Sequence, residues 1–386
     1  MIYLDNAATT PVPKAVADAM YDVLTHRFGN PSSQYPAGTE MKKAVEGWRA
    51  VVADALRCGS SRLYFTSCGT ESDNWAIQAA LWQNRHRGRH IITTAVEHSA
   101  ILEPCKLLAQ QGYEVTYLKP DRTGQITAAQ VADALRDDTV LVSVMLVNNE
   151  TGCVFPVEEI AALLRRRGSA ALLRRRGSAA LLHCDAVQGF LKVPCDPEGW
   201  GVDMMSLSAH KLGGPKGIGA LYIGQRVRNP RPLLPGGGQE RGIRSGTEAT
   251  AQIAGFAKAV ELRREDYEGK LTRMAALKDY CRTQLLTIDG MVCVGEGTAP
   301  HILAMSLVGY PSGNIVTDLG AQGICISAGS ACHQGKASHV VSALGLDKKT
   351  AAGVIRISFS PDNTEADVDA LCRALKSHRD SRFPML

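Results

Sequence analysis

A chain of 386 residues is long enough to fold as two domains, or as one large domain with a smaller partner. Its 45% hydrophobic and 21% charged residues are typical of a packed globular protein and exclude a disordered or fibrous one. The formal net charge of +5 includes three arginines from each copy of a duplicated segment, so losing one copy would leave +2. The rest of the chain has no basic stripe interleaved with aromatics, so we expect no direct binding of nucleic acid.

Membrane and disulfide signatures are not readable in the sequence. Every apolar run falls short of the roughly 20 residues that span a bilayer. Residues 1–5 lack the basic start and apolar core of a signal peptide, so we expect a cytoplasmic protein with no membrane partner. The eleven cysteines are an odd number without a CxxC pair, which indicates neither a disulfide framework nor a metal site.

Strand-like and helix-like stretches alternate between about residues 45 and 225. The apolar runs that predict strands are residues 63–66, 91–94, 114–118, 140–144, 181–184, 204–207 and 219–223. This alternation predicts an α/β domain around a mainly parallel, seven-stranded sheet. Ligands of such sheets bind at the carboxyl ends of the strands, so the residues that follow each run are the first candidates for chemistry.

The pattern changes near residue 250. A long helical stretch is predicted over 251–286, then strands near 304–307 and 354–358, and a last helix over 365–378 capped by Thr364. These elements predict a second, smaller α+β domain. We assign residues 16–250 to the large domain, and residues 1–15 together with 251–386 to the small one.

A nine-residue segment, 161–169, is repeated as residues 170–178. Nine residues are far fewer than the 20 to 50 of a repeat architecture, which indicates a tandem duplication at a helix end. A continuous helix would turn the second apolar cluster to the opposite face, because nine residues make about 2.5 turns. We therefore expect one copy to bulge out as a surface loop around Gly168 or Gly177.

The strongest chemical signal is segment 206–219, where a strand runs into Ser208, His210 and Lys211 and then a glycine-rich turn. A lysine directly after a buried strand can form a Schiff base with a carbonyl cofactor, because its amine loses its charge readily when desolvated. Taken alone, Lys211 is better explained as a surface lysine at a strand end. The residues around it favour the chemical interpretation.

Nine segments together resemble the cysteine desulfurases of the class-V aminotransferase group, the NifS- and IscS-like enzymes of fold-type I. The likeness covers nearly the whole chain and rests on residues 3–11, 29–33, 66–72, 97–98, 147–152, 183–188, 206–219, 241–247 and 327–332. The resemblance implies pyridoxal 5'-phosphate (PLP) as cofactor, bound to Lys211 in the large domain. It also implies a homodimer in which Thr247 reaches the phosphate of the neighbouring subunit.

The matching positions suit the parts of this cofactor. Gly69 and Thr70 open a helix after strand 63–66, and a helix N-terminus favours a phosphate. By resemblance, Ser208 and His210 add donors to the phosphate, His98 stacks on the ring and moves protons, and Asn149 and Gln188 donate to its phenolic oxygen. Asp185 is expected to pair with the pyridine nitrogen. For Thr70 an ordinary helix cap, and for Asp185 a structural ion pair, are the alternatives.

We expect the second domain to supply residues for substrate binding and sulfur transfer. Arg356 is expected to hold the carboxylate of L-cysteine, together with Asn149. Cys332 lies in a segment of small residues, 327–337, where His333 and Lys336 favour its thiolate. The resemblance implies that Cys332 attacks the sulfur of cofactor-bound cysteine, that L-alanine leaves, and that Lys211 and His98 carry the protons. The persulfide then passes to an acceptor protein, an iron–sulfur scaffold or a thiolation enzyme.

Departures from the family pattern keep alternatives open. Cys68 stands where a small residue is usual, the segment after Cys332 is about two residues shorter than in IscS-like chains, and the duplication lies just before Asp185. A shifted strand there would remove the acid partner of the cofactor. The alternatives are a selenocysteine lyase, a C–S lyase that releases free sulfide, and a scaffold inactivated by the duplication.

Overall fold

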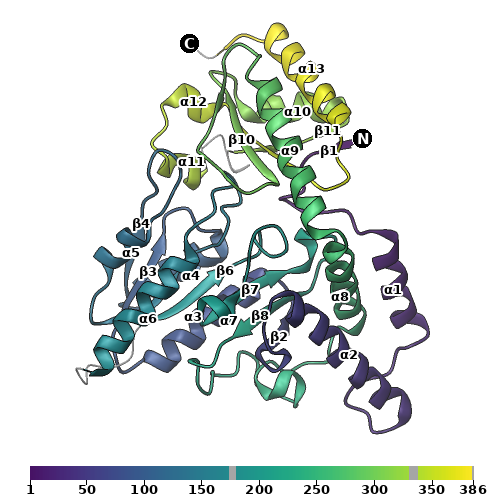
Figure 1. Cartoon of the computed structure of the whole chain (residues 1–386), viewed down its shortest axis with the longest axis vertical. Helices are drawn as coiled ribbons and strands as arrows, with labels where there is room; N and C mark the ends of the chain where they lie inside the picture. Colours follow the sequence, from purple (N-terminus) through teal and green to yellow (C-terminus); the bar gives the residue numbers. More distant parts are fainter. Residues whose placement is uncertain (174–179, 330–337, 385–386) are drawn as a thin grey trace.

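The computed structural model describes residues 1–173, 180–329 and 338–384, and a seven-stranded sheet lies at the centre of its larger part (Figure 1). The strand order is β2-β8-β7-β6-β5-β3-β4. The strands are β2 Leu63–Thr66, β3 His90–Thr94, β4 Glu114–Leu118, β5 Thr139–Ser143, β6 Leu181–Asp185, β7 Met204–Ser208 and β8 Gly219–Ile223. All seven predicted runs are therefore strands, and the α/β fold is confirmed.

The sheet is mainly parallel, as expected. β4, β3, β5, β6 and β7 pair in parallel, whereas β8 is antiparallel to both β7 and β2. β3, β5, β6, β7 and β8 are buried along their whole length, which explains why they read as continuous apolar runs rather than alternating ones. Because β2 also runs parallel to β7, the carboxyl ends of six strands meet at one edge.

Helices cover this sheet and connect its strands (Figure 1). α3, Gly69–Asn84, packs on β5 to β8 and on α4, and carries the buried Trp75. α1 and α2 pack against α8 and extend the same core. The bounds are α1 Lys14–Thr25, α2 Pro36–Ala55, α4 Ser99–Gln110, α5 Ala128–Ala134, α6 Val157–Leu173, α7 Pro197–Trp200 and α8 Thr250–Arg264.

A second, antiparallel sheet lies beside the first body (Figure 1). Its order is β12-β13-β10-β9, formed by β9 Met291–Cys293, β10 Ile302–Leu307, β12 Ser327–Ala328 and β13 Val354–Ser358. The helices of this part are α9 Tyr267–Leu285, α10 Ser312–Ala321, α11 His339–Ala343, α12 Lys348–Ala352 and α13 Glu365–Ser381. The N-terminal strand β1, Ile2–Tyr3, pairs with β11, Ile324–Cys325, so the start of the chain joins this second core.

The predicted helix over 251–286 is wrong in one respect, because it is two helices. α8 ends at Arg264 and α9 begins at Tyr267, with Asp266 in the left-handed region at φ 47°. α8 packs in the core of the large sheet, whereas α9 packs in the second core. The domain bounds at 15/16 and 250/251 stay a prediction, and this packing favours placing the second boundary between α8 and α9.

The duplicated segment does not bulge at Gly168. α6 continues through that glycine to Leu173, so the first copy and the start of the second form one helix. Gly177 lies outside the described residues. β6 begins at Leu181 and keeps its register with both neighbours, since Leu181 pairs with Leu141 and Asp185 with Ser206. The shift of β6 that would displace Asp185 therefore does not occur.

Candidate active site

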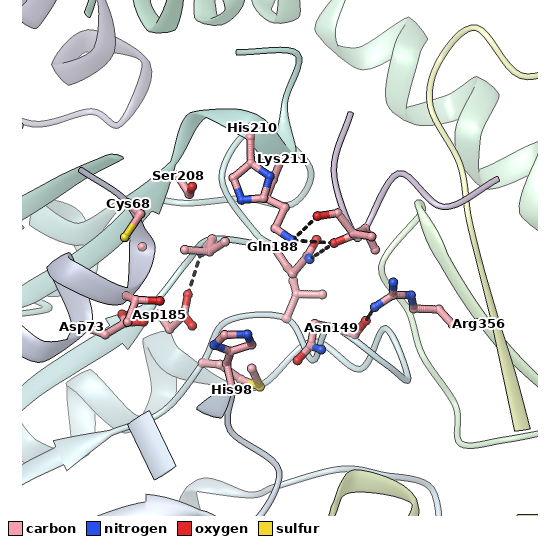
Figure 2. Close-up of a pocket in the computed structure, with 17 residues that line it drawn as sticks. Cys68, Asp73, His98, Asn149, Asp185, Gln188, Ser208, His210, Lys211 and Arg356 are labelled. Atoms are coloured by element: carbon pink, nitrogen blue, oxygen red, sulfur yellow. Dashed lines mark hydrogen bonds between the residues drawn. The ribbon is translucent and has the colours of Figure 1, made fainter. Parts of the chain in front are cut away.

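A cavity of about 330 Å³ opens where the carboxyl ends of β2, β3, β5, β6 and β7 meet. Figure 2 shows its labelled side chains, with Cys68 and Ser208 at one end, Arg356 at the other, and Lys211 and His98 between them. The lining residues are Ala7, Ala8, Cys68, Gly69, Thr70, Asp73, His98, Met145, Val147, Asn149, Asp185, Val187, Gln188, Ser208, His210, Lys211 and Arg356. Of the predicted site residues that the structure describes, all except Thr247 are among them.

One end of the cavity has the properties of a phosphate site. Gly69 is the first residue of α3, and a Cβ added there would lie 2.8 Å from Val187 Cγ2, so a larger residue at this helix N-terminus would have to displace Val187. The Ser208 hydroxyl lies in this wall, buried and without a hydrogen-bond partner among the described residues. A buried donor without a partner is costly unless a ligand completes it. The helix terminus, the glycine and the hydroxyl fit a phosphate.

Lys211 extends into the cavity from the end of β7. Its Nζ donates to the backbone carbonyls of Ala7 at 2.7 Å and Ala8 at 2.8 Å (Figure 2). Burial, and next the positive charge of Arg356, lower the pKa of Lys211 to about 8. An amine with this pKa is partly neutral near pH 7 to 8, which is the form that reacts with carbonyl compounds.

Asp185 and His98 form the acid–base pair of the opposite wall. Asp185 is the last residue of β6, and its Oδ1 accepts from the Val187 N–H at 2.9 Å. Burial raises the pKa of Asp185, whereas His98 and Lys211 act in the other direction. The Nδ1 of His98 accepts from the Ala100 N–H at the start of α4, and burial lowers the pKa of this imidazole. His98 therefore presents its Nε2 side to the cavity.

Asp73 and Glu97 are two further buried acids that sequence reasoning did not select. Burial and the charge of Asp185 raise the pKa of Asp73 well above its ordinary value. Burial raises the pKa of Glu97 to about 8, although its Oε1 accepts from Thr94 and from the Met145 N–H. Burial therefore favours the neutral form of both carboxyl groups. Asp185 differs from both, because His98 and Lys211 lie near it and oppose the rise of its pKa that burial causes.

Arg356 closes the other end of the cavity. Its Nη1 donates to the Asn149 carbonyl at 2.8 Å, and its Nη2 donates to Asp5 at 2.8 Å and to Ser327 at 2.9 Å. Nε is buried and has no partner among the described residues. The guanidinium is fixed in orientation and keeps a free donor, as a carboxylate-binding arginine requires. Asp5 and Ser327 were not predicted as its partners.

Gln188 and His210 occupy the wall beside Lys211. Gln188 Nε2 donates to the Ala7 carbonyl at 2.8 Å, the same carbonyl that accepts from Lys211. The Nδ1 of His210 lies 3.2 Å from the Thr9 hydroxyl. Burial, and next the charge of Lys211, lower the pKa of His210 to about 4, so this imidazole is neutral at physiological pH. Residues 7–9 of the N-terminal segment thus complete the wall.

One predicted site residue of the described part of the chain does not line this cavity. Thr247 is exposed and does not line it within the same chain, so its contribution to a neighbouring subunit stays a prediction. Cys332 lies outside the described residues. On the two sides of that gap, Gly329 donates its N–H to the Val354 carbonyl and Ser338 donates to Glu150 Oε2 at 2.6 Å. Both flanks are therefore attached next to Arg356 and Asn149.

No described helix is both long enough and apolar enough to cross a lipid bilayer.

Comparisons with known proteins agree with this geometry. The model of the aminotransferase class-V family matches residues 2–371. Cysteine desulfurase IscS of Methanosarcina thermophila is 41% identical over 372 residues, which cover 95% of this chain and 89% of that protein. Cysteine desulfurase 2 of Trichormus variabilis is 44% identical over 380 residues, covering 97% and 92% of the two chains.

Solved structures show the same fold. A NifS-like protein superposes with a TM-score of 0.90 at 34% identity, covering 98% of this chain and 99% of that one. SspA in complex with cysteine superposes with a TM-score of 0.80 at 33% identity, covering 94% and 100%. The matches span both sheets and every strand end that lines the cavity. The chain therefore belongs to the class-V aminotransferase family and, within it, to the cysteine desulfurases.

Proposed function

We propose that this protein binds PLP in the described cavity and removes sulfur from L-cysteine, giving L-alanine and a persulfide on Cys332. The observation that carries the proposal is the convergence of Lys211, Asp185 and Arg356 on one cavity, with an unpartnered Ser208 hydroxyl beside the helix N-terminus at Gly69. Lys211 suits the aldehyde, Asp185 the pyridine nitrogen and Arg356 the substrate carboxylate. Ser208 and the helix N-terminus suit the phosphate. SspA, a structural relative, was solved in complex with cysteine.

Each residue has a definite task in this reaction. Bound PLP would supply an electron sink for the α-carbon of the substrate. Asp185 would face the ring nitrogen and favour its protonated form. Arg356 orients the substrate through its carboxylate. The amine of Lys211, with its pKa lowered to about 8, removes and returns the α-proton, and His98 is the second proton carrier.

The sulfur-transfer step balances without an added oxidant. The Cys332 thiolate forms an S–S bond with the substrate sulfur while the bond between that sulfur and the substrate β-carbon breaks. The β-carbon receives a proton and becomes the methyl group of alanine. Cys332 is left as a persulfide, which a sulfur-acceptor protein, either an iron–sulfur scaffold or a thiolation enzyme, then takes up. We further propose that the working unit is a homodimer with Thr247 at the neighbouring site, and that it works in the cytoplasm.

The test compares products from L-cysteine plus a thiol reductant, for the PLP-loaded wild type, Cys332→Ala and the control Cys293→Ala, which changes an exposed cysteine elsewhere. We expect equal alanine and sulfide from the wild type and the control, and neither from Cys332→Ala with PLP still bound. Sulfide formation that survives Cys332→Ala would indicate a direct C–S lyase. Turnover of selenocysteine but not cysteine would indicate a selenocysteine lyase, and failure to retain PLP would indicate an inactive scaffold.

A further inference from the structure

Lys192 is a buried lysine directly behind the cavity wall. It lies four residues after Gln188, in the turn that follows β6, and its side chain is only 3% exposed. Its Nζ donates to Gln188 Oε1 at 3.2 Å. Lysine is among the residues that are almost never fully buried unless paired, so this position requires a reason.

The charged groups that act most strongly on Lys192 are cations. After burial, Arg263, Lys211 and Arg356 lower the pKa of this amine well below its ordinary value. His301 is buried nearby, and it too has a lowered pKa because of burial and the charge of Lys192. Placing an amine among cations costs folding free energy. A purely structural role would be served better by an apolar side chain of similar length.

The contact between Lys192 and Gln188 determines which way the amide faces. The Ala7 carbonyl can only accept, so the amide turns its nitrogen toward Ala7 and its oxygen toward Lys192, whose amine donates to it. At the other end, Gln188 Nε2 donates to the Ala7 carbonyl at 2.8 Å. Since the amide nitrogen carries two hydrogens, one N–H of Gln188 is left, and Gln188 lines the cavity.

We infer that Lys192 is a positioning residue of this active site: it holds the Gln188 amide with its oxygen turned inward, so that an N–H donor is presented to the cofactor in the cavity. The inference rests on the proposed function, because it concerns the phenolic oxygen of bound PLP. A donor at that oxygen stabilises its deprotonated form. Without Lys192, Oε1 loses its buried partner and the amide is held from one end only.

The test measures how the absorption of the PLP-loaded protein changes with pH. Lys192→Met removes the donor, and we expect the midpoint of the titration to rise by about one pH unit, the size of a modest hydrogen-bond effect. PLP affinity, measured by the same absorption, should fall. The matched control is Lys278→Met, another buried lysine whose Nζ donates to the carbonyls of Gly297 and Ala299, away from the cavity. Its midpoint should equal that of the wild type.

A second comparison isolates the path through Gln188. Gln188→Leu should raise the midpoint by itself, and Gln188→Leu combined with Lys192→Met should titrate like Gln188→Leu alone. A further shift in the double variant, or a wild-type midpoint in Lys192→Met, would overturn the inference. If the wild type does not bind PLP, the proposed function falls. If it binds PLP and turns over cysteine while Lys192→Met titrates unchanged, only the role of Lys192 falls.

Discussion

The guanidinium of Arg356 is paired with the carboxylate of Asp5 at 2.8 Å, although 351 positions separate the two residues. The pair exists because β1 pairs with β11, Asp5 then bridges to Ser358 at the end of β13, and the chain continues to the cavity through Asn6 to Ala8. Arg356 is therefore oriented before any substrate arrives, by one acid, one hydroxyl and one carbonyl. These partners use three of its five N–H groups, so the Nε–H and one Nη1–H have no partner among the described residues.

Arg356→Lys should weaken the binding of L-cysteine. Lysine keeps a positive charge but loses the planar fork that holds a carboxylate, and it cannot satisfy Asp5, Ser327 and Asn149 together. We expect KM for L-cysteine to rise about tenfold or more, with a smaller change in kcat, as follows from losing about one charged hydrogen bond. Initial rates of alanine formation over a range of cysteine concentrations measure both constants.

The matched control for this substitution is Arg382→Lys. Arg382 follows the end of α13 and donates to Asp318 at 3.0 Å, away from the cavity, so its replacement should leave KM unchanged. An unchanged KM in Arg356→Lys would contradict the assignment of Arg356 to the substrate carboxylate.

Lys211→Ala should abolish turnover while the protein still folds. Its two hydrogen bonds are to backbone carbonyls, and burial already disfavours its charge, so removing it costs little stability. We expect at least about a thousandfold loss of alanine formation, because both the covalent attachment point and the α-proton carrier are lost. Borohydride reduction followed by mass spectrometry should attach PLP to the wild type and not to Lys211→Ala.

Lys216→Ala is the control for Lys211→Ala, since Lys216 is exposed in the same glycine-rich turn. It should keep both the covalent label and the activity. A label that persists in Lys211→Ala would place the attachment point elsewhere.

The strand ends explain which part of the site the sequence could predict. Asp185 and Ser208 end strands that read as apolar runs and Lys211 lies three residues beyond Ser208, so a parallel sheet was enough to bring them together. Asp5 and Lys192 could not be found in this way. The partner of Asp5 lies across the fold, and the partner of Lys192 lies four residues before it. No sequence motif marks an acid or a lysine at those two positions.

The break between two helices could not be predicted from the sequence either. The break between α8 and α9 falls at Glu265 and Asp266, where neither glycine nor proline marks it. It is produced by the two helices packing in different cores, which is a tertiary effect. Conversely, Gly168 reads as a helix end but lies inside α6, since a single glycine costs a helix only about 1 kcal/mol.

Glu97 should make the stability of the apoprotein depend on pH. Its pKa is raised to about 8 in the folded state, whereas an unfolded glutamate titrates near 4.5, so the folded state binds more protons between these values. The stabilising contribution of neutral Glu97 is therefore complete below about pH 4.5 and is lost as the pH rises toward 8, by at most roughly 1.4 kcal/mol per pH unit. Glu97→Gln should remove this slope, which urea unfolding at several pH values will measure.

Gln can replace Glu97 at the hydrogen bonds that matter. Oε1 accepts from Thr94 and Met145, and an amide oxygen can do the same, while Oε2 has no partner among the described residues. The control Glu103→Gln changes an exposed acid on α4 that pairs with Lys106, and should leave the slope as in the wild type. Parallel slopes for Glu97→Gln and the wild type would show that Glu97 is ionised in the folded protein at neutral pH.

Deleting residues 170–178 should leave the active site intact. Deleting 161–169 gives the same sequence, so the experiment needs a single variant. β6 is buried throughout and pairs in register with β5 and β7, and a buried strand specifies its register through its own side chains. Shortening the connection changes the closure free energy only slightly. We expect the nine-residue deletion to keep PLP affinity and kcat/KM within about twofold of the wild type. The control is deletion of Leu182 alone, which shifts Asp185 within β6 and should abolish PLP binding. Loss of PLP binding in the nine-residue deletion would mean that the duplicated residues help to place Asp185.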